Sequence, residues 1–501
     1  MPDRTRYWDH LNKIAMQSSI GRINAQSDSG VESEMQNEAR QNMGYVVFLS
    51  VVAALGGFLF GYDTAVISGT IDQVAGQYHL DPMQQGWFVG CALVGSIAGV
   101  LVAGVLSDRL GRKKTMIISA ILFTVSGVGC AVSGSFDELV INRIIGGVGI
   151  GVVSIISPLY ISEVAITKYR GRLVSLYQLA ITIGFLGAYL VNYELLKVAA
   201  AGAFSGSIPL SKIFVTEFWR GMLGMESLPA FLFFLVIFFI PESPRWLMMR
   251  QQDGRALDVM GRIYGDPREA AAQADEVRRQ LRRGQRSDWR LLLKPAYFKA
   301  LLIGVAIAIL GQFMGVNAVL YYGPTIFRNS GLSDGDSLLY QVLVGAVNAL
   351  TTVLALLIID KVGRKKLVYY GVSGMILTLL LIAMYFVKGQ AWHIPAVVLL
   401  AFFLMYIFFC AVSICAVIWV LLSEMYPTAV RGIAMSIAGF SLWIGTYLIG
   451  QLTPWMLATL SPAGTFLLFA IMCLPYIWIV WKQVPETAGK SLEEIERMWE
   501  N

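Results

Sequence analysis

Twelve stretches of mostly apolar residues constrain this chain more than any other feature, because each is long enough to cross a bilayer as a helix. Of the 501 residues, 56% are hydrophobic and 14% are charged, whereas soluble domains carry about 25% charged residues. The stretches lie near residues 43–66, 86–106, 115–133, 138–160, 173–193, 222–240, 297–320, 338–359, 367–387, 394–421, 433–457 and 464–481. We therefore expect an all-α membrane protein with twelve transmembrane helices.

The basic residues around these stretches predict how the chain lies in the membrane. Lys and Arg gather after the second, fourth and eighth stretches, at 109–114, 168–172 and 361–366. Cytoplasmic loops carry this excess, so we expect both termini on the cytoplasmic side of a plasma membrane or bacterial inner membrane. Residues 1–42 lack the apolar core of a signal peptide. We expect cytoplasmic tails at 1–42 and 485–501, and cytoplasmic linker helices at 242–296.

Three motifs recur in the same order in the two halves of the chain. The sequence Asp-x-x-Gly-Arg-Lys-Lys follows the second stretch at 108–114 and the eighth at 360–366. Ser-Glu with a later Arg-Gly follows the fourth and tenth stretches, and Pro-Glu-Ser or Pro-Glu-Thr follows the sixth and twelfth. Such a repeat predicts two bundles of six helices, residues 43–241 and 297–484. It also predicts a substrate site between them near the middle of the membrane.

The charged residues of these motifs can make charge-assisted bonds between helix ends on the cytoplasmic side. If such bonds form only while that side is closed, they act as a gate that breaks when the protein opens inward. The alternative is that the charges only set the topology. The recurrence of paired acids and bases favours the gate. Its predicted members are Asp108, Arg112, Glu163, Arg172, Glu242, Arg245, Asp360, Arg364, Glu424, Arg431 and Glu486.

In these motifs the chain resembles the sugar porter family of the major facilitator superfamily, which includes bacterial proton-coupled xylose and other sugar permeases. The resemblance also rests on residues 57–63, 241–247, 312–317 and 485–489, and it extends from about Gly44 to the C-terminus. It implies the major facilitator fold. It also implies symport of a monosaccharide or related polyol with a proton by alternating access.

Two acids and one base inside the predicted helices are candidates for proton coupling. Asp63 lies in the first stretch and Arg143 in the fourth, where unpaired charges are costly. The resemblance implies that an acid at Asp63 marks proton-coupled members and that Arg143 is its partner, so that protonating Asp63 releases Arg143. Alternatively, Asp63 is a packing residue beside a wet vestibule. Glu226, in the sixth stretch, either modulates the coupling or is a buried structural acid.

A sugar site needs side chains that both donate and accept hydrogen bonds, as amides do, and an aromatic ring against the C–H face of the sugar. A single amide in a membrane more commonly bonds a neighbouring helix, but a whole set favours a pocket. The residues that the resemblance implies are Gln178, Gln312, Asn317, Tyr321, Tyr322, Asn348 and Trp419. Gln312 and Asn317 would project about 140° apart on a regular helix. We therefore expect that helix to unwind near its glycines.

Departures from the family pattern leave the identity of the substrate open. The chain has Phe185, Gly311 and Leu442 where close relatives carry polar amides, and Cys415-Ala416 replaces a Gly-Pro pair. These changes remove hydrogen-bonding groups, so one side of the pocket is expected to be more apolar. An ordinary monosaccharide held differently and a larger, partly apolar sugar-like molecule both remain compatible.

Other functions are less consistent with the sequence. An uncoupled facilitator would not need the acids and base inside the membrane, and a transporter-like sugar sensor would often carry a long signalling tail. No nucleophile-and-base set, phosphate-binding loop or CxxC pair occurs, so we expect no enzyme activity, cofactor or metal. We expect a monomer whose partners are the substrate, a proton and the lipid bilayer. The net charge of +6 fits cytoplasmic loops rather than nucleic-acid binding.

Overall fold

The computed structural model describes residues 42–202, 207–283, 289–389, 391–426 and 430–484, which form helices joined by turns. In this part of the chain, 12 helices are long and apolar enough to cross a membrane. The predictions of an all-α fold and of twelve spans are therefore confirmed. The tail expected at 485–501, and all but the last residue of the tail expected at 1–42, lie outside the described residues.

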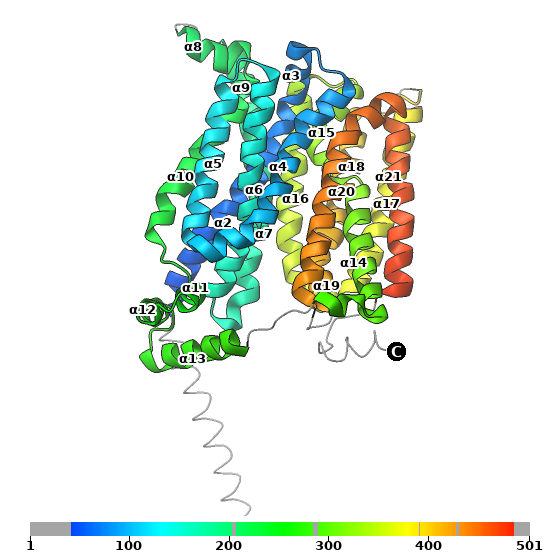
Figure 1. Ribbon diagram of the computed structural model, residues 1–501. Helices are drawn as coiled ribbons and strands as arrows, with labels where there is room; N and C mark the ends of the chain where they lie inside the picture. Colours follow the sequence, from blue (N-terminus) through cyan, green and yellow to red (C-terminus); the bar gives the residue numbers. More distant parts are fainter. Residues whose placement is uncertain (1–41, 203–206, 284–288, 390, 427–429, 485–501) are drawn as a thin grey trace, which may run out of the picture.

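The helices of the first half pack into one bundle, the N-terminal bundle, coloured blue to green in Figure 1. Helix α6 packs against α4 and α5, and α2 packs against α7. The sixth span is divided between α9 and α10. The helices are α2 (Met43–Val66), α4 (Pro82–Leu110), α5 (Arg112–Val132), α6 (Phe136–Val164), α7 (Arg170–Ala200), α9 (Trp219–Gly224) and α10 (Ser227–Val236).

The second half forms the C-terminal bundle, coloured green to red in Figure 1. In it α17 packs against α21 and α18, and α14 packs against α20. The tenth span contains a π-helical turn, η6, of residues Ala411–Cys415. The helices are α14 (Pro295–Phe313), α15 (Val316–Asn329), α16 (Asp334–Val362), α17 (Arg364–Lys388), α18 (Ala396–Cys410), α19 (Ala416–Met425), α20 (Arg431–Thr459) and α21 (Ser461–Gln483).

Three short helices connect the bundles at one end of the molecule, called here the linker end. They are α11 (Pro244–Met249), α12 (Asp253–Tyr264) and α13 (Pro267–Arg283). The opposite end carries α3 (Ile71–Tyr78) and α8 (Ile208–Ser211) (Figure 1). The two bundles meet mainly where α4 packs against α20 and α7 packs against α16.

Glycines allow the helices of the N-terminal bundle to approach closely. A Cβ atom added to Gly147 of α6 would lie 2.0 Å from the carbonyl oxygen of Ala92 in α4. One added to Gly151 would lie 2.1 Å from the carbonyl oxygen of Ser96. Small residues at helix contacts are the usual means of close packing inside a membrane. This contact holds α6, which carries Arg143, in a fixed position.

Candidate transport site

Asp63 and Arg143 form a buried ion pair between α2 and α6 of the N-terminal bundle. The Nη1 group of Arg143, on α6, donates to Oδ1 of Asp63, on α2. The side chain of Asp63 is 0% exposed and that of Arg143 is 2% exposed. An unpaired charge at such a site is strongly unfavourable, so each group stabilises the other in its charged form. The structure thus brings together the acid and the base that the sequence singles out.

Glu226 adds a second carboxyl beside this pair. It lies at the break between α9 and α10, it is 1% exposed, and it is close enough to Asp63 and Arg143 to interact with both electrostatically. Oδ2 of Asp63, Nε of Arg143 and Oε1 of Glu226 are buried without a hydrogen-bond partner. Two carboxyls therefore lie near one guanidinium. The two free carboxyl oxygens can take up a proton, and the free Nε–H of Arg143 can donate to a water molecule.

A small gap adjoins the ion pair and reaches the C-terminal bundle. Its volume is about 10 Å³, roughly the room that one water molecule needs. Asp63, Arg143 and Thr64 line it from the N-terminal bundle, and Tyr321 of α15 lines it from the other bundle. The ion pair in one bundle is thus in direct reach of a helix of the other.

The C-terminal bundle places a neutral polar cluster at its interior. Oε1 of Gln312, on α14, accepts hydrogen bonds from Nδ2 of Asn317 at 2.8 Å and from Oγ1 of Thr446 at 3.1 Å. Gln312 is 8% exposed and Thr446 is 5% exposed. Because one oxygen accepts both bonds, the amide NH₂ group of Gln312 remains free to donate to a ligand. We call these three residues the amide cluster.

A break in the seventh span brings Gln312 and Asn317 together. Helix α14 ends at Phe313 and α15 begins at Val316, with Gly315 between them at a φ of 90°. This left-handed conformation is favourable only for glycine. A Cβ atom at Gly315 would also lie 2.3 Å from Cδ2 of Phe469. The expected unwinding near the glycines of this span is therefore present in the structure.

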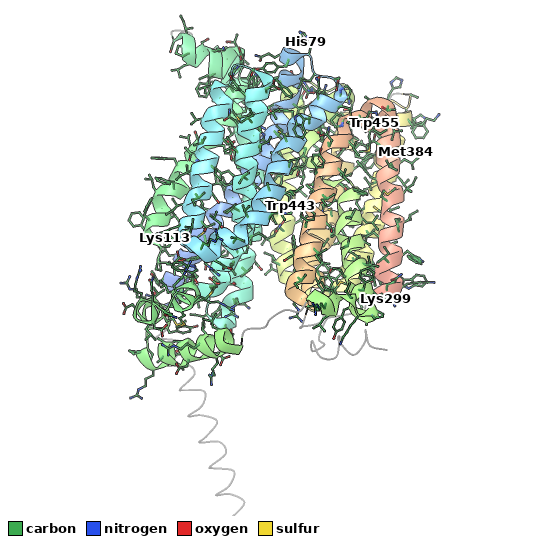
Figure 2. The ribbon with its side chains drawn as sticks, in the orientation of Figure 1. His79, Lys113, Lys299, Met384, Trp443 and Trp455 are labelled. Atoms are coloured by element: carbon green, nitrogen blue, oxygen red, sulfur yellow. The ribbon has the colours of Figure 1, made fainter. Side chains whose placement is uncertain are left out.

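Trp443, on α20, faces the N-terminal bundle at mid-height of the molecule (Figure 2). Its ring stacks on Phe60 of α2 with a centroid separation of 5.7 Å and an interplanar angle of 30°. Thr446 follows one turn later on the same helix and belongs to the amide cluster. An aromatic ring next to hydrogen-bonding groups is the combination that a sugar requires. Trp443 and Phe60 are therefore part of the candidate site.

The other predicted substrate residues do not join the amide cluster. Tyr321 and Tyr322 are buried, and the hydroxyl of Tyr322 donates to the carbonyl oxygen of Gly450 at 2.5 Å. Asn348 of α16 is buried, whereas Gln178 of α7 is half-buried. Trp419 of α19 is 42% exposed.

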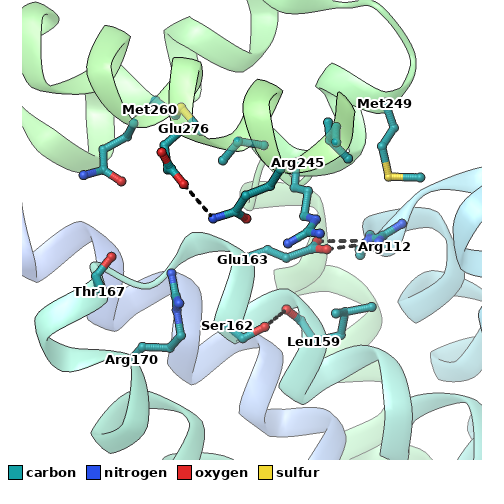
Figure 3. Close-up of a pocket in the computed structure, with 14 residues that line it drawn as sticks. Arg112, Leu159, Ser162, Glu163, Thr167, Arg170, Arg245, Met249, Met260 and Glu276 are labelled. Atoms are coloured by element: carbon teal, nitrogen blue, oxygen red, sulfur yellow. Dashed lines mark hydrogen bonds and ion pairs between the residues drawn. The ribbon is translucent and has the colours of Figure 1, made fainter. Parts of the chain in front are cut away.

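The predicted gate residues of the first half form a compact cluster at the linker end. Arg112 makes a bidentate ion pair with Glu163, with Nε to Oε2 at 2.9 Å and Nη2 to Oε1 at 3.0 Å. Its Nη1 also donates to Asp108 at 3.2 Å. Figure 3 shows this pair at the edge of a cavity of about 800 Å³, which Arg245 also lines. These bonds fasten together helices of one bundle.

Glu242, just after the sixth span, caps the start of α5. Its carboxylate accepts from the backbone N–H of Arg112 at 2.8 Å and of Lys113 at 3.2 Å. Burial raises the pKa of Glu242 above its usual value, although the backbone donors from Ser243, Lys113 and Arg112 partly oppose that rise. An acid at a helix N-terminus is favourable because the unpaired N–H groups there are partly positive.

The second half repeats this arrangement. Nη2 of Arg364, at the start of α17, donates to Oε1 of Glu424 at 3.0 Å, as Arg112 does to Glu163. Lys113 donates to the carbonyl oxygen of Phe238 at the end of the sixth span. The second half again contains its equivalent, because Lys365 donates to the carbonyl oxygen of Trp481 in the twelfth span at 2.9 Å.

The remaining predicted gate residues do not belong to these ion pairs. Arg431 donates to the carbonyl oxygen of Tyr426 at 3.3 Å, and Arg172 and Arg245 have exposed side chains. The side chain of Asp360 and the whole of Glu486 lie outside the described residues. The ion pairs named at the linker end all join helices of the same bundle. Whether these bonds form only while the cytoplasmic side is closed, as the gate hypothesis requires, stays a prediction.

At the opposite end, polar contacts do join the two bundles. Arg328 of α15 forms an ion pair with Asp72 of α3, and Oγ1 of Thr325 donates to Oδ2 of Asp72 at 2.8 Å. Nη1 of Arg328 also pairs with Asp334 at 2.9 Å. Farther in, Nε2 of Gln451 donates to the carbonyl oxygen of Met83 in α4 at 2.9 Å. We call Asp72, Thr325 and Arg328 the outer latch.

Sequence reasoning missed several of these residues. The outer latch joins positions 253 or more residues apart, and the sequence contains no motif that pairs them. Trp443 and Thr446 were detectable in principle, because an aromatic and a hydroxyl residue three apart share one face of a helix. Phe60 lies within the motif at 57–63, but the sequence gives no reason to assign it to the substrate site.

Known proteins resemble this chain over nearly its whole length. The family described as "Sugar (and other) transporter" matches residues 49–499. The arabinose-proton symporter of Bacillus subtilis is 38% identical over 458 residues, covering 91% of this chain and 96% of that protein. The D-xylose-proton symporter of Escherichia coli is 37% identical over 494 residues, covering 92% and 96%. The inward open conformation of the xylose transporter XylE from E. coli matches with a TM-score of 0.78 at 35% identity, over 91% of this chain and 100% of that one.

Proposed function

The chain belongs to the sugar transporter family, and we propose that it carries a monosaccharide or related polyol across the membrane together with a proton. It is a multi-pass membrane protein with 12 candidate spans among its described residues. The proposal depends chiefly on the buried group of Asp63, Arg143 and Glu226, because a carrier of neutral sugars alone has no need of ionisable groups at this depth.

The charge balance of this group explains how it can hold one proton. With both carboxyls ionised, two negative charges would face the single positive charge of Arg143 in a buried site, which is unfavourable. One added proton restores neutrality. In the observed arrangement Asp63 binds Arg143, whereas Oε1 of Glu226 has no hydrogen-bond partner, so Glu226 can carry the added proton. Protonating Asp63 would release Arg143 and change how α2 and α6 hold together.

Helix α15 connects this proton site with the amide cluster. Tyr321 lines the gap beside Asp63 and Arg143, and Asn317 lies one turn earlier on the same helix, bonded to Gln312. A movement of α15 therefore changes both sites together. Because α15 starts at the break around Gly315, it can move without dragging α14 with it. Proton and sugar occupancy are coupled through this helix.

The amide cluster and the neighbouring rings supply the groups that a sugar needs. Gln312 and Asn317 offer donors and acceptors for hydroxyl groups, and Trp443 and Phe60 offer an aromatic surface. Phe185 is buried against Tyr189, with ring centroids 6.2 Å apart, so this part of the site is apolar. The substrate is a small, neutral, hydroxylated molecule that tolerates an apolar wall on one side.

The two ends of the molecule fit an alternating-access cycle. The outer latch closes the opposite end, while Arg112–Glu163 and Arg364–Glu424 each tie helices within a bundle at the linker end. We assign the linker end to the cytoplasm, because the basic loops lie there. The observed state is then closed outside. In the reverse state the charged motifs of the two bundles would face each other and form the cytoplasmic gate. The monomer is the transporting unit.

The test is to reconstitute the protein in vesicles that contain a pH-sensitive dye and to add a panel of monosaccharides, polyols and inositols. One compound is expected to drive proton entry in wild-type vesicles and none in vesicles without protein. Entry of a radiolabelled compound without protons would instead support an uncoupled facilitator. Binding without entry would support a sugar sensor. Either of these two results would contradict symport.

A further inference from the structure

Two thiols lie next to each other in the π-helical turn of the tenth span. The Sγ atoms of Cys410, the last residue of α18, and Cys415, the last residue of η6, are 3.7 Å apart. Cys410 is buried, whereas the side chain of Cys415 is partly exposed. The turn lies between α18 and α19, and α19 carries Trp419 and ends near Glu424.

The closeness of the two sulfurs is a consequence of the π-helical turn. On a regular α-helix, residues five apart project about 140° from each other, and their side chains do not meet. A π-helical turn, with its i to i+5 hydrogen bonds, stacks residues five apart above one another. The distance between the Cys410 and Cys415 sulfurs therefore reports the geometry of η6. If the turn rewound into an α-helix, the thiols would separate.

The π-helical turn η6 packs closely against α17. A Cβ atom added to Gly371 of α17 would lie 2.0 Å from Oγ of Ser413 and 2.9 Å from the carbonyl oxygen of Phe409. Ser413 in turn donates to the carbonyl oxygen of Phe409 at 2.6 Å. Glycine thus allows α17 to approach the wider turn. The turn is the joint at which the two parts of the tenth span, α18 and α19, can change their relative direction, because π-helical turns interrupt the regular helix.

We propose that Cys410 and Cys415 are a redox-modification site, whose reversible disulfide fixes the π-helical turn and slows the conformational cycle. The effect on the cycle depends on the proposed transport function, whereas formation of the bond does not. A disulfide needs its sulfurs about 2.05 Å apart, so the two Sγ atoms have to approach each other by about 1.7 Å within one helix turn. Cys415 is the less buried of the two residues, so we expect it to react first.

The chemistry is thiol–disulfide exchange with a small disulfide such as oxidised glutathione. The thiolate of Cys415 attacks one sulfur of the oxidant and displaces one glutathione thiolate, which leaves a mixed disulfide. The thiolate of Cys410 then attacks the sulfur of Cys415 and displaces the second glutathione. Two cysteine thiols lose two protons and two electrons, and the oxidant takes them up to become two glutathione thiols. A dithiol reductant reverses both steps.

The first test reads the bond directly in the full-length protein. Purified transporter is incubated with oxidised glutathione, its free thiols are blocked with N-ethylmaleimide, and the peptides are examined by mass spectrometry. We expect a peptide containing residues 410–415 that is two hydrogens lighter and carries no label, and its loss after dithiothreitol. The variant Cys415→Ser is expected to yield labelled Cys410 instead. Absence of the bond, or a bond from Cys410 to Cys473 in α21, would overturn the proposal.

The second test reads the consequence for uptake in vesicles. Oxidation is expected to lower the wild-type rate roughly tenfold, because a turn held in one geometry disfavours the other states of the cycle. Dithiothreitol is expected to restore the rate. Cys410→Ser and Cys415→Ser are expected to be insensitive, whereas the control variants Cys91→Ser and Cys130→Ser, which alter the N-terminal bundle, keep the full response. Unchanged uptake with the bond present would contradict the locking of the turn. It would leave the proposed transport function untouched.

Discussion

The two bundles repeat each other at the linker end and differ in their interiors. Arg112 with Glu163 and Arg364 with Glu424 occupy equivalent positions and make equivalent bonds. Deeper inside, the N-terminal bundle buries charged residues. Among the described residues of the C-terminal bundle, by contrast, the buried polar side chains are all uncharged. The bundles share a common arrangement of helix ends, and under the proposed function the N-terminal bundle binds the proton and the C-terminal bundle binds the sugar.

This difference has a physical reason. A proton site needs groups whose charge can change, and burial makes that change energetically large. A sugar site needs groups that both donate and accept while staying neutral, so that the hydroxyls of the substrate exchange with water at small net cost. Placing the two sites in different bundles keeps the charges away from the sugar. The contact of Tyr321 with the gap beside Asp63 still connects the sites.

Removing the base of the proton site should have the largest effect on stability. Arg143→Leu leaves Asp63 as a buried charge without its partner, which is expected to cost about 3–5 kcal/mol. Thermal unfolding of the purified protein measures this loss. The double variant Arg143→Leu with Asp63→Asn should recover much of it, because no uncompensated charge remains. Equal stability of the single and double variants would show that the ion pair is not the source of the effect.

The repeated pairs at the linker end should differ in strength. Arg112 is 5% exposed and binds both Glu163 and Asp108, whereas Arg364 is 13% exposed, with Glu424 at 23%. Arg112→Ala is therefore expected to lower the free energy of unfolding by about 3 kcal/mol, and Arg364→Ala by about 1–2 kcal/mol. Chemical denaturation of both variants in parallel measures the difference. A larger loss for Arg364→Ala would contradict this ranking.

The amide cluster should affect the sugar and leave the proton site unchanged. Gln312→Ala removes the acceptor for Asn317 and Thr446 and a donor for the substrate, so the affinity for the transported sugar is expected to fall about tenfold or more. Equilibrium binding measures this loss. Thr446→Val removes one hydroxyl of the cluster and should lower the affinity for the sugar by less. If Gln312→Ala also changed proton binding in the absence of sugar, this would contradict the assignment of proton and sugar binding to different bundles.

The outer latch should have the smallest effect, because its members are partly exposed. Asp72→Asn weakens the pair with Arg328, which is expected to shift the balance between the two open states by about twofold to fivefold. Uptake at low and high salt concentration measures this shift. Salt screens the ion pair, so the difference in uptake between the variant and the wild type should be smaller at high salt. Asp81→Asn, in the same end but outside the latch, serves as the control. An equal response of both variants would exclude a specific latch.

The sequence predicts the parts of the structure that follow from local patterns. The twelve spans follow from hydropathy, and the convergence of Gln312 and Asn317 follows from the helix break at Gly315, which lies between them. The contacts of Trp443 with Phe60 and of Asp72 with Arg328 depend on how the two bundles meet, which no local pattern encodes. The replacement of Gly-Pro by Cys415-Ala416 indicates an altered bend. It does not reveal the π-helical turn, because that turn depends on the packing of α17.

The most direct test of a division between a proton bundle and a sugar bundle is to measure both fluxes in Asp63→Asn. Vesicles report proton entry through a pH-sensitive dye and sugar exchange through a radiolabel, with wild type and Gln312→Ala alongside. We expect Asp63→Asn to lose sugar-driven proton entry by about a hundredfold while it still exchanges sugar across the membrane. Undiminished proton entry in Asp63→Asn, or loss of sugar binding to the extent seen in Gln312→Ala, would contradict the account.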